Sequence, residues 1–268
     1  MKPQVYIDPR PAESFDRYHR RVRSGRPDAV YPTVRILLTP PLAVLFRVRA
    51  IGAENVPTHG AAILAPNHFS NLDHFLLAMY VRRQVQFMAK SQLFVPPIDW
   101  IMNHGGTFPV LRGRHDEEAF ITAHTVLRRG GVVGMYGEGG RSRTKKLGKP
   151  KSGLGRLALE SGVPVVPVAI HGSEHARDLR FPKVTLQYGK AVIFDQVEHP
   201  TREQAEHASI QVFDRIRAMY DALCEKGRRG VVRERRDHRR RHGRLDTQPT
   251  YLRAEQTYQR EPEKTRVA

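Results

Sequence analysis

Short apolar runs alternate with amphipathic stretches from residue 51 to about residue 195. The runs that predict buried strands cover residues 61–66, 85–90, 106–111, 131–138 and 163–170. Between them, apolar positions recur at helical spacing over residues 72–83, 115–129 and 153–162. Strand–helix alternation at this spacing predicts an α/β fold with a mostly parallel central sheet flanked by helices.

The pattern continues in a less regular form to residue 225. Residues 183–194 predict two further strands, separated by a turn at residues 188–190, and residues 201–225 predict a last amphipathic helix. Pro167 lies inside the apolar run 163–170. Because proline cannot donate to a strand ladder, we expect that run to form an irregular edge strand.

The two ends of the chain differ from this middle part. Residues 1–30 are polar and weakly periodic, whereas residues 36–46 are apolar, contain two prolines and are too short to span a bilayer. The apolar segment is either buried or a membrane-contacting helix with basic flanks. From about residue 228 the chain is too polar to form a core, so we expect disorder. The predicted divisions are a lead-in with interfacial segment (1–50), a catalytic-type domain (51–225) and a basic tail (226–268).

The charge of the chain narrows the choice of partners. The formal net charge is +18 and the pI is about 10.6, with 14 Lys or Arg against 7 Asp or Glu in residues 225–268. Such a surplus favours nucleic acid, an anionic membrane surface or phosphorylated substrates as partners. Cys224 is the single cysteine, which excludes a disulfide within the chain and a cysteine-based metal site. The N-terminal residues lack the apolar region of a secretory signal, so we expect a cytoplasmic protein.

The first candidate for chemistry is APNHFSNLDHFLL, residues 65–77. A strand ending at Pro66 places His68 in a loop at the carboxyl edge of the sheet, where the sites of α/β proteins gather. Asp73 then falls in the first turn of a helix, where the dipole favours a carboxylate. The pair is either a loop residue with a helix cap or a general base oriented by a carboxylate. A third interpretation is a metal site that also includes His74, although no second cluster supplies further ligands.

Two later stretches carry groups suited to phosphate. In GGTFPVLRG, residues 105–113, Arg112 is either a surface arginine or a fixed fork for a phosphate. The glycine-rich loop within residues 136–155 is either solvated surface or a phosphate site, and it lacks the P-loop spacing. Solvated surface explains Glu138 least well, since this carboxylate follows a predicted strand. The loop's basic residues are Arg141, Arg143, Lys145, Lys146, Lys149 and Lys151.

The order of these stretches resembles the glycerolipid acyltransferase family, which includes 1-acylglycerol-3-phosphate acyltransferases. The matching patterns are His-x4-Asp preceded by Asn, Gly-x-Phe-Pro-Val-x-Arg, Glu-Gly-x-Arg-Ser and Val-Pro-x-x-Pro-Val, within about residues 50–195. The resemblance implies that His68 is the catalytic base and Asp73 its orienting carboxylate. It further implies substrate-binding roles for Lys90, Phe108, Arg112, Glu138, Gly139, Arg141 and Pro167.

The sequence departs from the family pattern at two of these motifs. Gly140 stands where threonine is usual in the third motif, which bears on acceptor preference more than on the chemistry. Pro109 stands where many members have an aliphatic residue. Neither position belongs to the His68–Asp73 pair.

The reaction implied by the resemblance is O-acyl transfer in phospholipid biosynthesis. An acyl thioester, either acyl-CoA or acyl carrier protein, would acylate 1-acyl-glycerol-3-phosphate to phosphatidate, with His68 as the base. Glycerol 3-phosphate, another lysophospholipid or a glycolipid precursor are the alternative acceptors. We expect no cofactor or metal, peripheral or monotopic association with the inner face of the cell membrane, an anionic membrane surface as partner, and no nucleic acid. The alternative from a different class is a non-catalytic basic protein that binds membranes or nucleic acid.

Overall fold

The computed structural model describes residues 7–25, 28–113, 116–142, 144–176, 181–242 and 252–254. Arg143, and residues 243–251 and 255–268 of the predicted tail, lie outside the described residues. The strands are β1 (Arg49–Ile51), β2 (Ala62–Pro66), β3 (Val85–Lys90), β4 (Phe108–Val110), β5 (Val132–Gly134), β6 (Val165–His171), β7 (Thr185–Tyr188), β8 (Val192–Ile193) and β9 (Leu252–Arg253). The α-helices are α1 (Asp16–Ser24), α2 (Val30–Leu45), α3 (Asp73–Met79), α4 (Ile98–His104), α5 (Glu117–Arg128), α6 (Ser152–Ser161) and α7 (Arg202–His242). Short 3-10 helices are η1 (Ala12–Phe15), η2 (Ala53–Asn55), η3 (Ser91–Leu93) and η4 (Ser173–His175).

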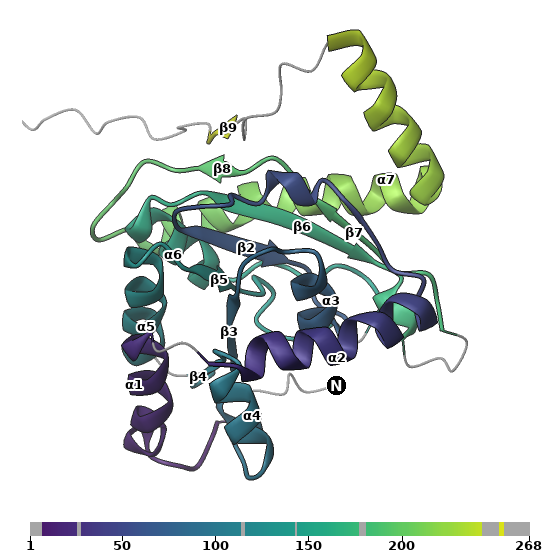
Figure 1. The fold of residues 1–268 in the computed structure, drawn as a ribbon. Helices are drawn as coiled ribbons and strands as arrows, with labels where there is room; N and C mark the ends of the chain where they lie inside the picture. Colours follow the sequence, from purple (N-terminus) through teal and green to yellow (C-terminus); the bar gives the residue numbers. More distant parts are fainter. Residues whose placement is uncertain are drawn as a thin grey trace, which may run out of the picture.

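The central sheet has the strand order β1-β7-β6-β2-β5-β3-β4 (Figure 1). Along this path, neighbouring strands are parallel except for the antiparallel pair β6 and β7. This confirms the predicted α/β fold with a mostly parallel central sheet. Because β2 and β5 are parallel neighbours, the loops that follow them meet at one edge of the sheet. That edge carries His68 and Glu138.

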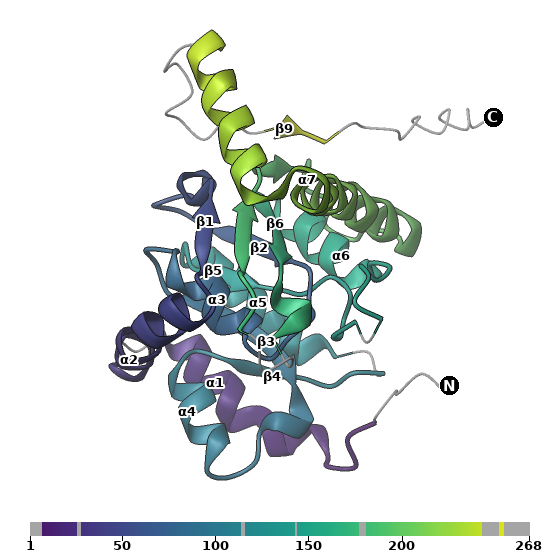
Figure 2. The ribbon, with the colours of Figure 1, turned by 90° about the vertical axis from the view of Figure 1, so that its right-hand side faces the viewer.

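The sheet is buried on both faces, as its continuous apolar runs indicate. Along β2, Ile63 and Ala65 pack with α5, α6 and α7 in one core cluster. The alternate residues Ala62 and Leu64 pack with α3 on the opposite face. Figure 2 shows the two helical layers on either side of the sheet. β2 is therefore held rigidly up to the loop that carries His68.

The strand that contains Pro167 is an interior strand, so the expectation of an edge strand is wrong. β6 lies between β2 and β7, and Pro167 pairs in register with Ala65 of β2. The Pro167 carbonyl accepts a hydrogen bond of 2.8 Å from the Gly189 amide, on the side of β7. The nitrogen of Pro167 faces the same side, at the interruption between β7 and β8. No donor to the β2 ladder is lost, which explains why proline is accepted there.

The apolar N-terminal segment forms α2, which lies on the surface. None of its residues is buried, and Ile36 and Val44 are 71% and 75% exposed. The interpretation of a buried segment is therefore wrong for this helix, although Phe46 and Val48 just after it enter the core. Within the described residues, no helix has both the length and the apolarity needed to cross a membrane.

The basic tail does not become disordered at residue 228, because α7 continues to His242 across a kink at Gly227. Val231 packs into the core, and the Arg228 guanidinium donates to the carbonyls of Val184 and Arg47. These contacts anchor the helix after the kink despite its low hydrophobicity. Beyond the kink, the helix projects at the end of the molecule opposite α2 (Figures 1 and 2). Its exposed face carries Arg229, Arg233, Arg236 and Arg240.

Candidate active site

The loop that follows β2 is fixed by Asn67. The fully buried Asn67 side chain donates from Nδ2 to the Ile170 carbonyl at 3.0 Å and accepts from the Ile170 amide at 2.7 Å. This pair of bonds continues the β2–β6 ladder with side-chain atoms in place of backbone. Asn67 thus holds the start of the loop against β6, and the next residue is His68.

His68 and Asp73 form a buried hydrogen-bonded pair, as the sequence predicts. The His68 Nδ1 lies 2.9 Å from Asp73 Oδ2, and the two side chains are 7% and 0% exposed. The same Oδ2 accepts the backbone amides of Phe69 and Ser70, each at 2.8 Å. Asp73 is thus both a helix-start acceptor and the partner of His68. Since Nδ1 carries the hydrogen donated to Asp73, Nε2 is the nitrogen that can accept a proton.

Two further rings hold the His68 imidazole in place. The Tyr136 ring is stacked on it with centroids 4.0 Å apart, and the His74 ring meets it edge-on at 5.2 Å. His74 also packs against Tyr136 and Phe87. This burial, followed by the nearby His68, lowers the pKa of His74 to about 4. His74 is therefore neutral at physiological pH and serves as part of the aromatic wall.

Glu138 binds the backbone and joins two loops. Its Oε1 accepts the His68 amide and its Oε2 accepts the Gly148 amide, each at 2.9 Å. Burial raises the pKa of this carboxyl, while the two amide bonds lower it. Because both oxygens are occupied by amides, the geometry favours a positioning role over the implied contact with substrate. Gly139, with φ of +67°, makes the turn that follows, where a β-carbon would lie 2.9 Å from the Lys151 side chain.

Arg112 and Arg141 lie together beside this pair of loops. A β-carbon added at Gly140 would lie 3.5 Å from Arg112 Nη1, so Arg112 reaches the glycine-rich loop. Burial and then the charge of Arg141 lower the pKa of Arg112. The Ser142 amide, next to Arg141, donates to the His68 carbonyl at 2.9 Å. Among the residues that the structure describes, no carboxylate pairs with Arg112, so the cluster suits a bound anion.

The remaining predicted substrate residues are placed away from this cluster. Phe108 is fully buried in the core and packs against His19 of α1. Pro167 is buried within β6 and lies against Gly189. A fully buried ring or strand residue has no open face for substrate, so these two positions support the fold. Lys90 ends β3 at the same carboxyl edge of the sheet and is half-buried.

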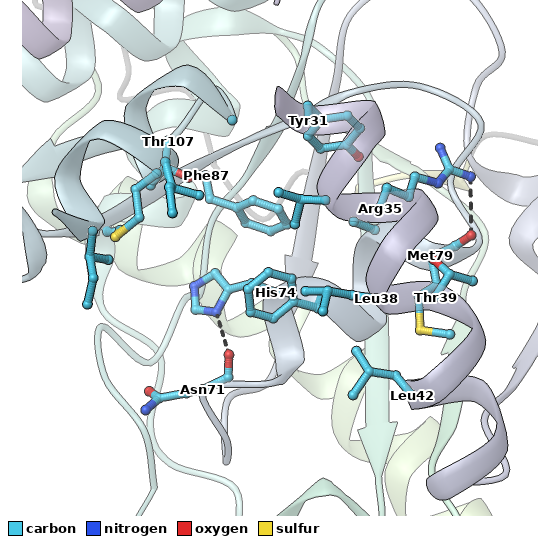
Figure 3. A pocket seen from close by; sticks show the side chains of 18 of the residues that line it. Tyr31, Arg35, Leu38, Thr39, Leu42, Asn71, His74, Met79, Phe87 and Thr107 are labelled. Carbon is cyan, nitrogen blue, oxygen red and sulfur yellow. Dashed lines mark hydrogen bonds between the residues drawn. The ribbon is translucent and has the colours of Figure 1, made fainter. Parts of the chain in front are cut away.

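An apolar cavity of about 300 Å³ opens next to the His68–Asp73 pair. It lies between α2, α3, α4 and β3, and its walls include Leu38, Phe75 and Ile101. Figure 3 shows His74 and Asn71 at this cavity, with Tyr31 and Arg35 of α2 across from them. Since His74 also touches the His68 ring, the cavity adjoins the candidate base. In the described parts of the chain, no group of three metal-binding side chains is assembled.

Several residues that shape the site carry no clear signal in the sequence. Tyr136 and Phe87 lie next to His68 only because β2, β5 and β3 are sheet neighbours. His74 was considered as a metal ligand, but its position next to the cavity depends on the α2 packing. The asparagine before His68 belongs to the recognised motif, and its burial explains why that position needs two opposed hydrogen-bonding groups.

Comparison with known proteins identifies the segment that carries these groups. The Acyltransferase family model matches residues 47–171. A chloroplastic 1-acyl-sn-glycerol-3-phosphate acyltransferase of Arabidopsis thaliana is 31% identical over 132 residues, covering 48% of this chain and 37% of the relative. A counterpart from Brassica napus is 28% identical over 168 residues, covering 59% of this chain and 45% of the relative. The chain thus spans less than half the length of these two curated relatives.

A solved structure shares the fold. The crystal structure of the 1-acyl-sn-glycerophosphate acyltransferase PlsC from Thermotoga maritima matches with a TM-score of 0.53 and 21% identity. The match covers 78% of this chain and 89% of that chain. The His68–Asp73 pair, Arg112 and Arg141 all lie within the segment matched by the family model. The chain belongs to the glycerolipid acyltransferase family.

Proposed function

We propose that this protein transfers an acyl chain from a thioester to the hydroxyl of 1-acyl-glycerol-3-phosphate, giving phosphatidate. The observation that carries the proposal is the buried His68–Asp73 pair, which lies at one sheet edge with Arg112 and Arg141. The curated relatives named as 1-acyl-sn-glycerol-3-phosphate acyltransferases support this acceptor. Membership of the family favours an enzyme over a non-catalytic basic protein.

In the proposed mechanism, His68 acts as the general base. Nε2 takes the proton of the acceptor hydroxyl, and the resulting alkoxide attacks the thioester carbonyl carbon. The carbon–sulfur bond of the tetrahedral intermediate breaks, and the leaving thiolate takes the proton from the imidazolium. Asp73 fixes the tautomer and stabilises the imidazolium through Oδ2. General-base assistance of this kind contributes typically about 10²–10⁴-fold in rate.

The basic cluster would bind the phosphate of the acceptor. Two adjacent cations repel each other when the site is empty, and a dianionic phosphate relieves that repulsion. Arg112 is partly buried beside the loop of Arg141, so its guanidinium offers a fixed fork. Anchoring the phosphate places the acceptor hydroxyl near His68, which lowers the entropic part of the barrier.

The apolar cavity would receive an acyl chain. Its walls are almost entirely aliphatic and aromatic, and it adjoins His68 through His74. A chain bound there would bring its thioester toward Nε2. Whether the thioester comes from acyl-CoA or from acyl carrier protein is decided by a comparison of the two donors in the assay below.

The surface around this cavity would contact a membrane from one side. Apolar side chains are exposed on both rims, and they include Ile36, Leu37, Val44, Phe75, Leu93, Val95, Ile98, Trp100 and Ile101. Several of these residues also line the cavity. An exposed apolar surface of this kind is typical of an interfacial site. We propose peripheral association with the inner face of the cell membrane, which would let lipid substrates enter the cavity directly.

The acceptor is tested with the purified protein and a panel of acceptors. A glycerol-3-phosphate acyltransferase from Pseudomonas fluorescens, 28% identical over 134 residues and covered to 16% of its length, makes glycerol 3-phosphate the first alternative. Each acceptor is supplied with acyl-CoA or acyl carrier protein, and products are identified by mass spectrometry. We expect phosphatidate from lysophosphatidate. Equal acylation of a monoacylglycerol, which lacks the phosphate, would contradict the role of the basic cluster.

A further inference from the structure

The two carboxylate oxygens of Asp73 have unequal surroundings. Oδ2 accepts three hydrogen bonds, from His68, Phe69 and Ser70. Oδ1 is buried and has no hydrogen-bond partner among the residues that the structure describes. A buried carboxylate oxygen without a donor is strongly disfavoured, so a partner is expected.

The Tyr136 hydroxyl is a second buried polar group in the same place. Within the described chain it also has no hydrogen-bond partner, and the residue is 8% exposed. Its ring is stacked on His68 with an interplanar angle of 29°. The imidazole therefore lies against Tyr136 through its face and is bonded to Asp73 through its edge.

The hydroxyl of Tyr136 faces the inner side of α3. Burial raises the pKa of Tyr136, and the charges of Asp73 and then Tyr188 raise it further. The Tyr188 hydroxyl donates to the Leu77 carbonyl at 2.8 Å, which lies one turn after Asp73 on α3. The groups whose charge reaches the Tyr136 hydroxyl thus lie along one side of that helix.

We propose that Tyr136 is a positioning residue of the His68–Asp73 pair, with its hydroxyl donating to Asp73 Oδ1 through one bridging water. One water with two or more polar partners is the usual way in which such buried groups are satisfied. The bond fixes the rotation of the carboxylate and draws part of its charge away from the imidazole. Tyr136 thereby sets both the orientation and the basicity of His68. This inference rests on the proposed role of His68 as base.

The test compares Tyr136→Phe with Tyr188→Phe. Tyr136→Phe keeps the stacked ring and removes only the hydroxyl, while Tyr188→Phe removes a buried hydroxyl bonded elsewhere. Without its donor, the Asp73 carboxylate holds the protonated His68 ring more strongly. We expect the acid limb of the kcat/KM profile to move up by about 0.5 to 1 pH unit in Tyr136→Phe alone. We also expect kcat to fall roughly threefold to tenfold. An acid limb that coincides with wild type would overturn the inference, even if kcat falls, because a structural role alone would leave it unmoved.

A spectroscopic readout separates this inference from the proposed function. The His68 ring is followed by ¹⁵N NMR in histidine-labelled protein and assigned with His68→Ala. Upward movement of its titration midpoint in Tyr136→Phe, and not in Tyr188→Phe, supports the hydrogen bond even if His68→Ala retains turnover and the base assignment fails. If Tyr136→Phe does not fold, a crystal structure of the wild-type protein decides. An ordered water bonded to both oxygens supports the inference, and a separation that one water cannot bridge overturns it.

Discussion

Protonation of His74 should destabilise the folded protein. Its ring packs against His68, Tyr136 and Phe87, and this burial lowers its pKa from 6.5 to about 4. A histidine with a lowered pKa contributes fully above the unfolded value of 6.5, and its contribution is lost as the pH falls toward 4. With about 1.4 kcal/mol for each pH unit, the free energy of unfolding falls by about 2 kcal/mol between pH 7 and pH 5 through this residue.

The substitution that isolates this effect is His74→Phe, which keeps a ring and removes the titration. The free energy of unfolding is measured by urea denaturation at pH 7 and pH 5. Between these pH values, wild type should lose about 2 kcal/mol more than the variant. His59→Phe, at an exposed position, is the control and should follow wild type. Equal losses in wild type and His74→Phe would refute the argument that burial keeps His74 neutral.

Three further substitutions test the parts of the site. Asn67→Ala leaves two buried backbone groups unpaired, so it should lower the free energy of unfolding by about 2 to 4 kcal/mol in urea denaturation. Arg112→Met should raise the KM for lysophosphatidate roughly tenfold with a smaller change in kcat, whereas the exposed Lys149→Met should not. Leu38→Trp should reduce turnover of long-chain thioesters by filling the cavity, and Leu37→Trp, on the outer face of α2, should leave it unchanged. Equal kinetics within either matched pair would argue against the assigned site.

The layered fold could be predicted because its strands are buried on both faces. The run at residues 85–90 and β3 have the same bounds, since its apolar residues end where charged residues begin. α4 was not predicted, because it is a single short helix with exposed apolar residues and no clear period. The helical part of the tail was predicted as disordered because hydrophobicity averages over the few residues, such as Val231, that anchor it.

The site could be predicted in part. The spacing of His68 and Asp73 fits a loop and a first helical turn, so local geometry brings the two side chains together. Glu138 shows the limit of this reasoning, because a motif does not tell whether a carboxylate faces a substrate or a backbone amide. Tyr136 could not be linked to His68 from the sequence, because their contact depends on β2 and β5 being neighbours in the sheet.

The central claim is that His68 is the base for acyl transfer to a phosphate-bearing acceptor. The most direct measurement is the turnover of lysophosphatidate to phosphatidate by wild type and by His68→Ala, side by side and with both thioester donors. Circular dichroism confirms that the variant is folded. We expect the variant's kcat to be lower by about 10²–10⁴-fold. A folded His68→Ala protein with turnover near that of wild type would contradict the account.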